Sequence, residues 1–176
     1  MRHNAAKLII LASALIVGAC TGTPAYKNSK ISAEKRTADL LKRMTTEEKL
    51  GQLLCPLGWP MYEKTSDTTA TYSAEFVEFI QKQHGGMLWA TFRADPWTRK
   101  TLENGLSPRA AAEAYNALQH YAVDSTRLGI PILLAEEAPH GHMAIGTTVF
   151  PTSLGLAATW DKALDRKSTR LNSSHT

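Results

Sequence analysis

The sequence predicts an α/β fold in which helices cover a parallel β-sheet. Two short apolar runs, at residues 86–92 and 130–135, each follow an amphipathic stretch that begins at a capping residue. This alternation of helix and buried strand is typical of parallel sheets covered by helices. The composition agrees, because 43% of the 176 residues are hydrophobic and 20% are charged. That balance excludes a disordered chain, a collagen-like chain and a disulfide scaffold.

The positive charge lies at the two ends of the chain. The formal net charge is +4, but residues 1–19 carry two basic and no acidic side chains, and residues 165–176 carry three basic and one acidic. The remainder, residues 20–164, has equal numbers of basic and acidic side chains and is neutral. Because binding to phosphates needs a clustered basic surface, the sequence predicts no nucleic-acid partner.

Residues 1–19 have the pattern of a secretory signal peptide. Arg2 and Lys7 precede an apolar run at residues 8–17, which is too short to span a bilayer of roughly 30 Å as a helix. Residues 17–20, Val-Gly-Ala-Cys, resemble the lipobox of bacterial lipoproteins. The resemblance implies that Cys20 is lipidated and anchors the protein to a membrane. The alternatives are an ordinary signal peptide cut near Ala19 or a short buried helix.

The segments that flank the central region differ from it in composition. Residues 20–30, rich in Thr, Ser, Pro and Gly, are expected to form the lipidated cysteine and a flexible tether. Residues 165–176 have no hydrophobic period and resemble the translation of a common high-throughput sequencing adapter. We therefore leave this tail out of the fold prediction, with a natural polar tail as the alternative.

The first two predicted helices are marked by their caps. Ser32 precedes an amphipathic stretch at about residues 33–43, with Leu40, Leu41 and Met44 on one face. A capping box at residues 45–48 predicts a second short helix. Its apolar side chains should point into the core: Leu50, Leu53 and Leu54.

The region after the second helix is expected to be irregular. Cys55 should be a small buried apolar residue, since a lipidated Cys20 would leave it without a disulfide partner. Residues 56–72 are polar and contain Trp59 and Pro60, so we expect a loop.

The third predicted helix begins after Ser73 and ends at residues 84–86, with Phe76, Val77 and Ile80 on its inner face. A buried strand at residues 86–92 follows. Ser107 and Pro108 then mark the start of a helix that extends to about Ser125. Its buried residues should be Ala111, Ala114, Tyr115, Leu118, Tyr121 and Ala122.

The last third of the chain contains the second predicted strand and a long loop. The strand covers residues 130–135, with a proline near its start, where a missing hydrogen-bond donor is tolerated. A loop at residues 136–152 precedes a short helix at residues 153–159. A further helix is expected to begin at Trp160 and Asp161.

The densest group of reactive side chains is in residues 135–142, directly after the second strand. In an α/β barrel, the loops after the strands form the active site. Glu136 and Glu137 do not make a glycosidase couple, because adjacent residues at a strand end tend to point to opposite faces. At most one of them should face a site.

Three alternatives remain open for this group and its surroundings. Glu137, His140 and His142 could bind a metal, although their spacing lacks the helical His-Glu-x-x-His pattern. Glu136 and His142 could instead brace the loop by hydrogen bonds. Four aromatic residues could stack on a sugar, although core packing is favoured for each: Trp59, Trp89, Phe92 and Trp97.

At these residues the sequence resembles glycoside hydrolase family 3, the β-glucosidase and β-xylosidase type, in its exported Bacteroidetes forms. The strings that carry the resemblance lie at residues 133–161, with support at 44–52, 85–88, 93–97 and 126–131. The match covers about residues 31–164 and is most specific in its last third.

The resemblance implies the N-terminal portion of a (β/α)8 barrel, truncated here and followed in the family by a second α/β domain. An acidic residue at the position of Glu137, often Asp in the family, binds hydroxyls of the sugar in the −1 subsite, and His140 shapes the loop or lines the subsite. The nucleophile and the general acid/base lie beyond residue 164, so no catalytic residue is assigned. No nucleotide-binding loop or flavin fingerprint is present, so no cofactor is expected.

The resemblance predicts hydrolysis of terminal non-reducing β-D-glucosyl or related β-glycosyl residues by a retaining mechanism. The substrate would be a β-linked oligosaccharide or glycoside, with glucoside and xyloside both open. We expect an exported lipoprotein on the periplasmic or cell-surface side of a Gram-negative envelope. The fragment alone should be inactive. The alternatives are a non-catalytic carbohydrate-binding lipoprotein and a natural short protein of another function.

Overall fold

The computed structural model describes residues 23–166, which divide into two compact units at Met44 and Thr45. In the first unit, a 3-10 helix η1 (Ala25–Lys27) precedes helix α2 (Ala33–Arg43). The helix predicted at residues 33–43 is confirmed, although none of its residues is buried. The backbone N–H of Tyr26 donates to Asp39 at 3.0 Å, which fixes η1, within the expected tether, against α2. Cys20 lies outside the described residues.

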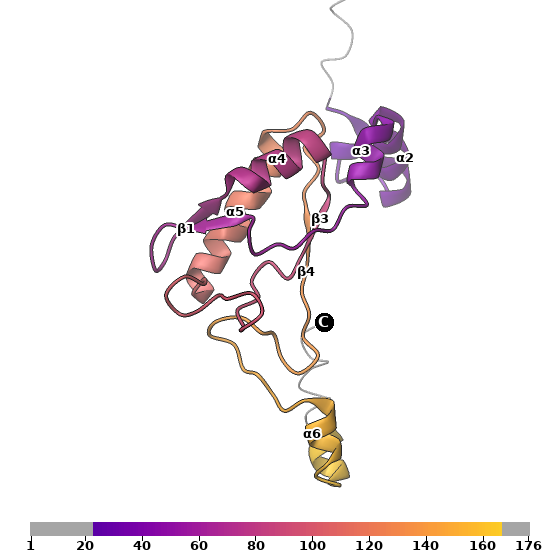
Figure 1. Cartoon of the computed structure of the whole chain (residues 1–176). Coiled ribbons are helices and arrows are strands. Elements are labelled where there is room, and N and C mark those ends of the chain that lie inside the picture. Colours follow the sequence, from indigo (N-terminus) through magenta and orange to yellow (C-terminus); the bar gives the residue numbers. More distant parts are fainter. Residues whose placement is uncertain (1–22, 167–176) are drawn as a thin grey trace, which may run out of the picture. The chain divides into compact units, whose positions relative to one another are not determined.

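The second unit begins at Thr45 and contains every other helix and strand that the structure describes (Figure 1). In chain order these are α3 (Thr46–Gly51), β1 (Tyr62–Lys64), β2 (Ala70–Tyr72), α4 (Ala74–Gln83), β3 (Met87–Trp89), α5 (Pro108–Asp124), β4 (Leu133–Ala135) and α6 (Ser153–Ala157).

Helix α3 confirms the predicted cap but not the predicted orientation. The Thr45 hydroxyl accepts from the Glu48 backbone at 3.2 Å, and the Glu48 carboxylate accepts from the Thr45 backbone at 2.8 Å. The leucines expected in the core are exposed instead: Leu50, Leu53 and Leu54. The helix approaches α4 through Gly51, where an added Cβ would lie 2.2 Å from the Gln83 carbonyl oxygen. This contact buries Gly51 instead of the leucines.

The prediction of a loop at residues 56–72 is wrong in part, because two strands lie within it. Strands β1 and β2 form an antiparallel hairpin, with Tyr62 opposite Tyr72, and both strands contact α5. Strands of three residues are too short to show an alternating pattern, so residues 56–72 carry no strand signal. Cys55, expected to be buried, is exposed because it follows the outward-facing end of α3.

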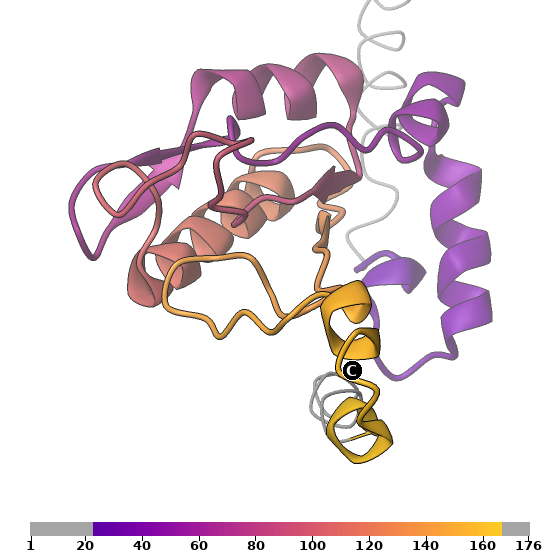
Figure 2. The same ribbon diagram turned by 60° about the horizontal axis from the view of Figure 1, so that its bottom comes forward.

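Strands β3 and β4 are parallel, as predicted, with Met87 opposite Leu133 and Trp89 opposite Ala135. They lie side by side in both views (Figures 1 and 2). On the other edge of β3, Trp89 pairs with Leu57 in a parallel bridge. The parallel arrangement thus has three adjacent backbone segments. Within residues 23–166 the strands do not close into a barrel.

Helices α4 and α5 cover one face of β3 and β4. The core between them contains Phe76 and Phe79 from α4, Leu118 from α5, Leu88 from β3 and Ile132 just before β4. The opposite face is less covered, since Leu133 is 59% exposed whereas Leu88 is fully buried. The prediction of strands buried on both faces is therefore wrong for β4. Its apolar sequence fits a position that a further layer would cover.

The remaining helices begin at capping side chains. Ser107 Oγ accepts from the Ala110 backbone at 3.2 Å, which confirms the predicted start of α5, but Tyr115 is exposed instead of buried. Thr152 caps α6, one residue before the predicted start. Asp161 accepts from the Ala163 backbone, and residues 162–166 are helical as expected. No helix in residues 23–166 is long and apolar enough to cross a membrane.

Candidate functional site

Three backbone segments of the second unit run parallel and finish together at the carboxyl end of the strands. Gly58 donates its backbone N–H to the Trp89 carbonyl at 2.7 Å, and Ala90 donates to the Ala135 carbonyl at 2.8 Å. The residues that follow these contacts therefore lie together at the carboxyl end of the strands. They are Trp59 after the first segment, Arg93 after β3, and Glu136 and Glu137 after β4. This is the end at which α/β proteins place their sites.

Glu136 turns toward the protein. One carboxylate oxygen accepts from the Phe92 backbone at 3.0 Å, and the other lies 3.1 Å from Nε2 of His142. Because a carboxylate only accepts hydrogen bonds, Nε2 carries the proton in this contact. Glu136 and His142 thus brace the strand-end loops against each other, which is the bracing alternative considered above.

Glu137 turns the other way. Its side chain is 50% exposed, and Oε2 lies 3.1 Å from Nη1 of Arg93. The two adjacent carboxylates have different partners, as the alternation of side chains at a strand end predicts. Glu137 is therefore more exposed than Glu136 and Asp95, whose side chains are 21% and 14% exposed.

Arg93 connects the loops that follow β3 and β4. Its Nε donates to Asp95 Oδ2 at 2.7 Å while Nη1 reaches Glu137. Partial burial alone would raise the pKa of Asp95, but hydrogen bonds from the Thr98 backbone and from Arg93 lower it below its usual 3.8. Arg93 was not among the site residues predicted from the sequence. Its place directly after a strand, like that of Glu137, is the signal that could have found it.

Three tryptophans lie together, and one of them, Trp97, contacts Arg93. The ring centroids of Trp59 and Trp97 are 4.8 Å apart in an edge-to-face arrangement, and those of Trp89 and Trp97 are 5.9 Å apart. Core packing is confirmed for Trp59 and Phe92, which pack against a buried cluster. For Trp97 it is wrong, since this residue is 55% exposed. Its indole is supported by other rings and open on its outer side.

His140 and Gly141 form the turn that brings the loop after β4 back on itself. The His140 carbonyl accepts from the Phe150 backbone at 2.6 Å. Gly141 has φ 101°, and an added Cβ would lie 2.2 Å from the Thr148 carbonyl oxygen, so only glycine fits. Among residues 23–166, no three His, Cys, Asp or Glu side chains are grouped so that they could hold a metal ion.

Two residues beside the site have shifted pKa values that the sequence did not indicate. Burial, with a smaller contribution from the charge of Glu136, raises the pKa of Tyr62 to about 12. Burial also lowers the pKa of Lys100, whose ammonium lies 4.7 Å from the centroid of the Tyr62 ring. Both shifts are consequences of packing under the loops.

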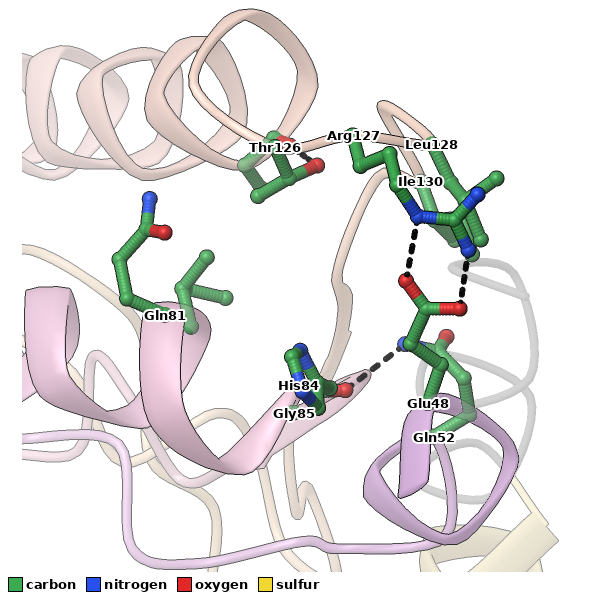
Figure 3. A pocket seen from close by; sticks show the side chains of 11 residues that line it. Glu48, Gln52, Gln81, His84, Gly85, Thr126, Arg127, Leu128 and Ile130 are labelled. Atoms are coloured by element: carbon green, nitrogen blue, oxygen red, sulfur yellow. Dashed lines mark hydrogen bonds and ion pairs between the residues drawn. The ribbon is translucent and has the colours of Figure 1, made fainter. Parts of the chain in front are cut away.

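A cavity of about 230 Å³ lies at the opposite end of the strands, between the ends of α3, α4 and α5 (Figure 3). Its polar groups pair with one another. Glu48 Oε1 accepts from Arg127 Nε at 3.1 Å, and Gln52 donates to the His84 carbonyl at 3.0 Å. In barrels this end contributes to stability and not to catalysis. The strand-end residues are therefore the better candidate site.

The second unit has parallel strands covered by helices, with a carboxylate, an arginine and an exposed indole at the carboxyl ends of the strands. This arrangement is typical of the class of α/β proteins that have their sites at strand ends. The chain belongs to glycosyl hydrolase family 3, because the model of the family's N-terminal domain matches residues 45–174. In this family that domain is of the TIM-barrel type.

Characterised relatives agree with this assignment. The chain is 32% identical to beta-glucosidase C of Emericella nidulans over 158 residues, which cover 82% of this chain and 22% of the relative. It is 28% identical to the periplasmic beta-glucosidase/beta-xylosidase of Dickeya chrysanthemi over 152 residues, which cover 81% of this chain and 21% of the relative. The chain thus spans about a fifth of the length of these relatives.

Proposed function

We propose that this chain supplies part of the sugar-binding barrel of a retaining β-glycosidase that removes terminal non-reducing β-D-glucosyl or related β-glycosyl residues. The observation that carries the proposal is the half-exposed carboxylate of Glu137, held at the carboxyl end of β4 by Arg93. It stands in the string where the sequence resembles family 3 most specifically. The names of the relatives, β-glucosidases and β-xylosidases, support the same substrate class.

Glu137 has the chemistry for this role. An ionised carboxylate accepts hydrogen bonds at both oxygens, and one of them already faces Arg93. The other is available to accept from sugar hydroxyls. His140 would shape the loop beside that sugar.

Hydrolysis needs groups beyond those in residues 23–166. A retaining glycosidase places two carboxyl groups about 5–5.5 Å apart on either side of the glycosidic bond. Glu136 cannot join Glu137 in that arrangement, because both of its oxygens face the Phe92 backbone and His142. The nucleophile and the acid/base would come from the remainder of a longer protein, and this chain alone would be inactive.

The experiment is to express the longest natural gene product that contains this chain and to assay aryl β-D-glucoside, β-D-xyloside and α-D-glucoside. We expect release of the aryl group from a β-glycoside, with the preferred sugar settling glucoside against xyloside, and no release by residues 21–164 alone. Binding of carbohydrate without hydrolysis would favour the non-catalytic lipoprotein instead. Turnover and a cooperative thermal transition by residues 21–164 would contradict the inactivity of the fragment.

We propose that the protein is an exported lipoprotein anchored through Cys20 on the periplasmic or cell-surface side of a Gram-negative envelope. The support is the pattern of residues 1–20 alone. Metabolic labelling with a fatty-acid analogue tests it, with Cys55→Ser as the matched control for Cys20→Ser. Label should persist in C55S and disappear in C20S, and label that persists in C20S would exclude this anchor.

We also propose that residues 165–176 derive from a sequencing adapter, on the strength of the string itself. The family match extends to residue 174, across this tail, so the protein sequence alone does not separate the two origins. Sequencing reads across codon 164 decide between adapter bases and a natural continuation.

A further inference from the structure

The Arg93 side chain makes several contacts to which the proposed function assigns no role. Its side chain is only 17% exposed, although it lies in the loop beyond the carboxyl end of β3. It contacts three different groups: the carboxylates of Asp95 and Glu137, and the ring of Trp97, whose centroid lies 4.9 Å from the guanidinium carbon. A largely buried guanidinium with three partners is held in one orientation.

The contacts use the geometry that only arginine has. Nε binds Asp95 at 2.7 Å and Nη1 binds Glu137 at 3.1 Å, so two separate nitrogens of one rigid plane hold two carboxylates. The face of the same plane lies over Trp97, which is a cation–π contact. A lysine has a single nitrogen and no planar face, so it could keep at most one of these contacts at a time.

Asp95 anchors this arrangement to its own loop. Its Oδ1 accepts from the Thr98 backbone at 2.9 Å, and its backbone N–H donates to the Thr98 hydroxyl at 3.1 Å. The Thr98 hydroxyl in turn donates to the Asp95 carbonyl. Arg93 is therefore fixed from the side opposite Glu137, and the position of Glu137 depends on a loop that follows a different strand.

The result is a carboxylate and an aromatic surface connected by one side chain. Within residues 23–166, Oε1 of Glu137 has no hydrogen-bond partner, whereas Oε2 is held by Arg93. Trp97 is 55% exposed and supported on its edge by Trp59. A pyranose presents both hydroxyls and an apolar C–H face, which match a carboxylate oxygen and an indole, respectively.

We propose that Arg93 is a positioning residue of the sugar site, which orients Glu137 toward a pyranose hydroxyl and holds Trp97 as the adjoining stacking surface. This rests on the proposed role of Glu137 in sugar binding. Arg93 itself does not touch the sugar. Its effect on substrate passes through Glu137 and Trp97.

A double-mutant cycle in the longest natural gene product tests the coupling between Arg93 and Glu137. Arg93→Met removes both ion pairs but keeps an unbranched side chain, and we expect kcat/KM for the aryl β-glycoside to fall about 100-fold, the cost of a misplaced binding group. In the Glu137→Gln background the same change should cost less, only about tenfold, because the contact with Glu137 is already lost and the contact with Trp97 is what remains to be removed. Arg93→Lys should recover only part of the activity. Arg99→Met, at an exposed arginine of the same loop, should change nothing.

A merely structural role for Arg93 would give a different pattern. Arg93→Met would then lower kcat/KM equally in the wild-type and Glu137→Gln backgrounds, together with the thermal midpoint, and Arg93→Lys would restore both. That additive result overturns the inference and leaves the proposed function standing. If Arg93→Met fails to fold, Arg93→Lys carries the same comparison.

A binding measurement separates this inference from the proposed hydrolysis. Quenching of tryptophan fluorescence by the aryl β-glycoside reports binding at Trp97, with Trp97→Phe as the control. If the wild type binds without hydrolysis and Arg93→Met weakens binding more when Glu137 is present than in the Glu137→Gln background, the inference holds and the catalytic proposal fails. If the wild type neither binds nor hydrolyses β-glycosides, both are overturned.

Discussion

Two neighbouring carboxylates at the end of β4 have different environments. Glu136 has both oxygens engaged and is 21% exposed, whereas Glu137 is 50% exposed and has one oxygen held by Arg93. The alternation of side chains along a strand is sufficient to separate them. One residue therefore serves the loop structure, and its neighbour keeps one carboxylate oxygen open to solvent.

Tyr62 should make the protein sensitive to alkaline pH. Burial raises its pKa to about 12 from a usual value of 10, so the folded state favours the neutral phenol. The stability that this provides is fully present below about pH 10 and is lost as the pH rises toward 12. Thermal midpoints measured from pH 9 to 11.5 should fall less steeply in Tyr62→Phe than in the wild type. Parallel curves for the two proteins would contradict this.

Glu48 should have the opposite pH dependence. The hydrogen bond from Arg127 holds the pKa of Glu48 below its usual 4.5, so the ion pair stabilises the folded state above that pH and is lost as the pH falls through the folded pKa. Arg127 is 56% exposed, and solvent screening limits the pair to about 0.5 kcal/mol. Glu48→Gln keeps an acceptor for the Thr45 backbone, so it isolates the charge. Its midpoint should lie below that of the wild type at pH 7, and the difference should shrink as the pH falls below 4.5.

At the scale of helices and strands, the starts of α3, α4 and α5 could be predicted because a cap is a local feature. Thr45, Ser73 and Ser107 each accept from a backbone N–H three residues later, as their sequence positions suggest. The outward orientation of the leucines of α3 could not be predicted in the same way. It depends on the contact of Gly51 with the end of α4, far away in sequence.

The cap of α5 is open to a direct test. Ser107→Ala removes the acceptor for the Ala110 backbone N–H and also the hydrogen bond that Ser107 donates to the Asp67 carbonyl at 2.6 Å. The loss of such a cap costs about 1 kcal/mol, so amides in the first turn of α5 should exchange about fivefold faster with solvent. Hydrogen exchange read by mass spectrometry measures this in the longest natural gene product. Ser107→Thr, which keeps a hydroxyl, should exchange like the wild type, and equal rates in all three proteins would show that the cap contributes nothing.

Part of the candidate site could also be predicted from the sequence, because it depends on local features. The position of residues 135–142 after an apolar run was sufficient to select this string, and the resemblance to family 3 then indicated Glu137 and His140 within it. The opposite directions of Glu136 and Glu137 followed from strand geometry. Arg93 and Trp97 were harder to place, because their contacts join the loop after β3 to the loop after β4. Such pairings between distant segments leave no periodic signal in one sequence.

At the scale of the whole second unit, the parallel strands are fully covered on one face and less covered on the other. Leu88 is buried under α4 and α5, while Leu133, on the opposite face of the strands, is 59% exposed. In a closed barrel the face opposite the helices is filled by side chains from the other strands. The family assignment explains this exposed face. The N-terminal domain of family 3 is of the TIM-barrel type, in which side chains from the other strands cover that face.

The most direct test of this account is the kcat/KM of the longest natural gene product for its preferred aryl β-glycoside, compared between the wild type and Glu137→Ala. If Glu137 accepts a hydrogen bond from the sugar that strengthens in the transition state, kcat/KM should fall at least about 100-fold. Glu63→Ala, at an exposed carboxylate on β1, should retain the wild-type value. A kcat/KM for Glu137→Ala within about twofold of the wild type would contradict the assignment of the sugar site to the end of β4.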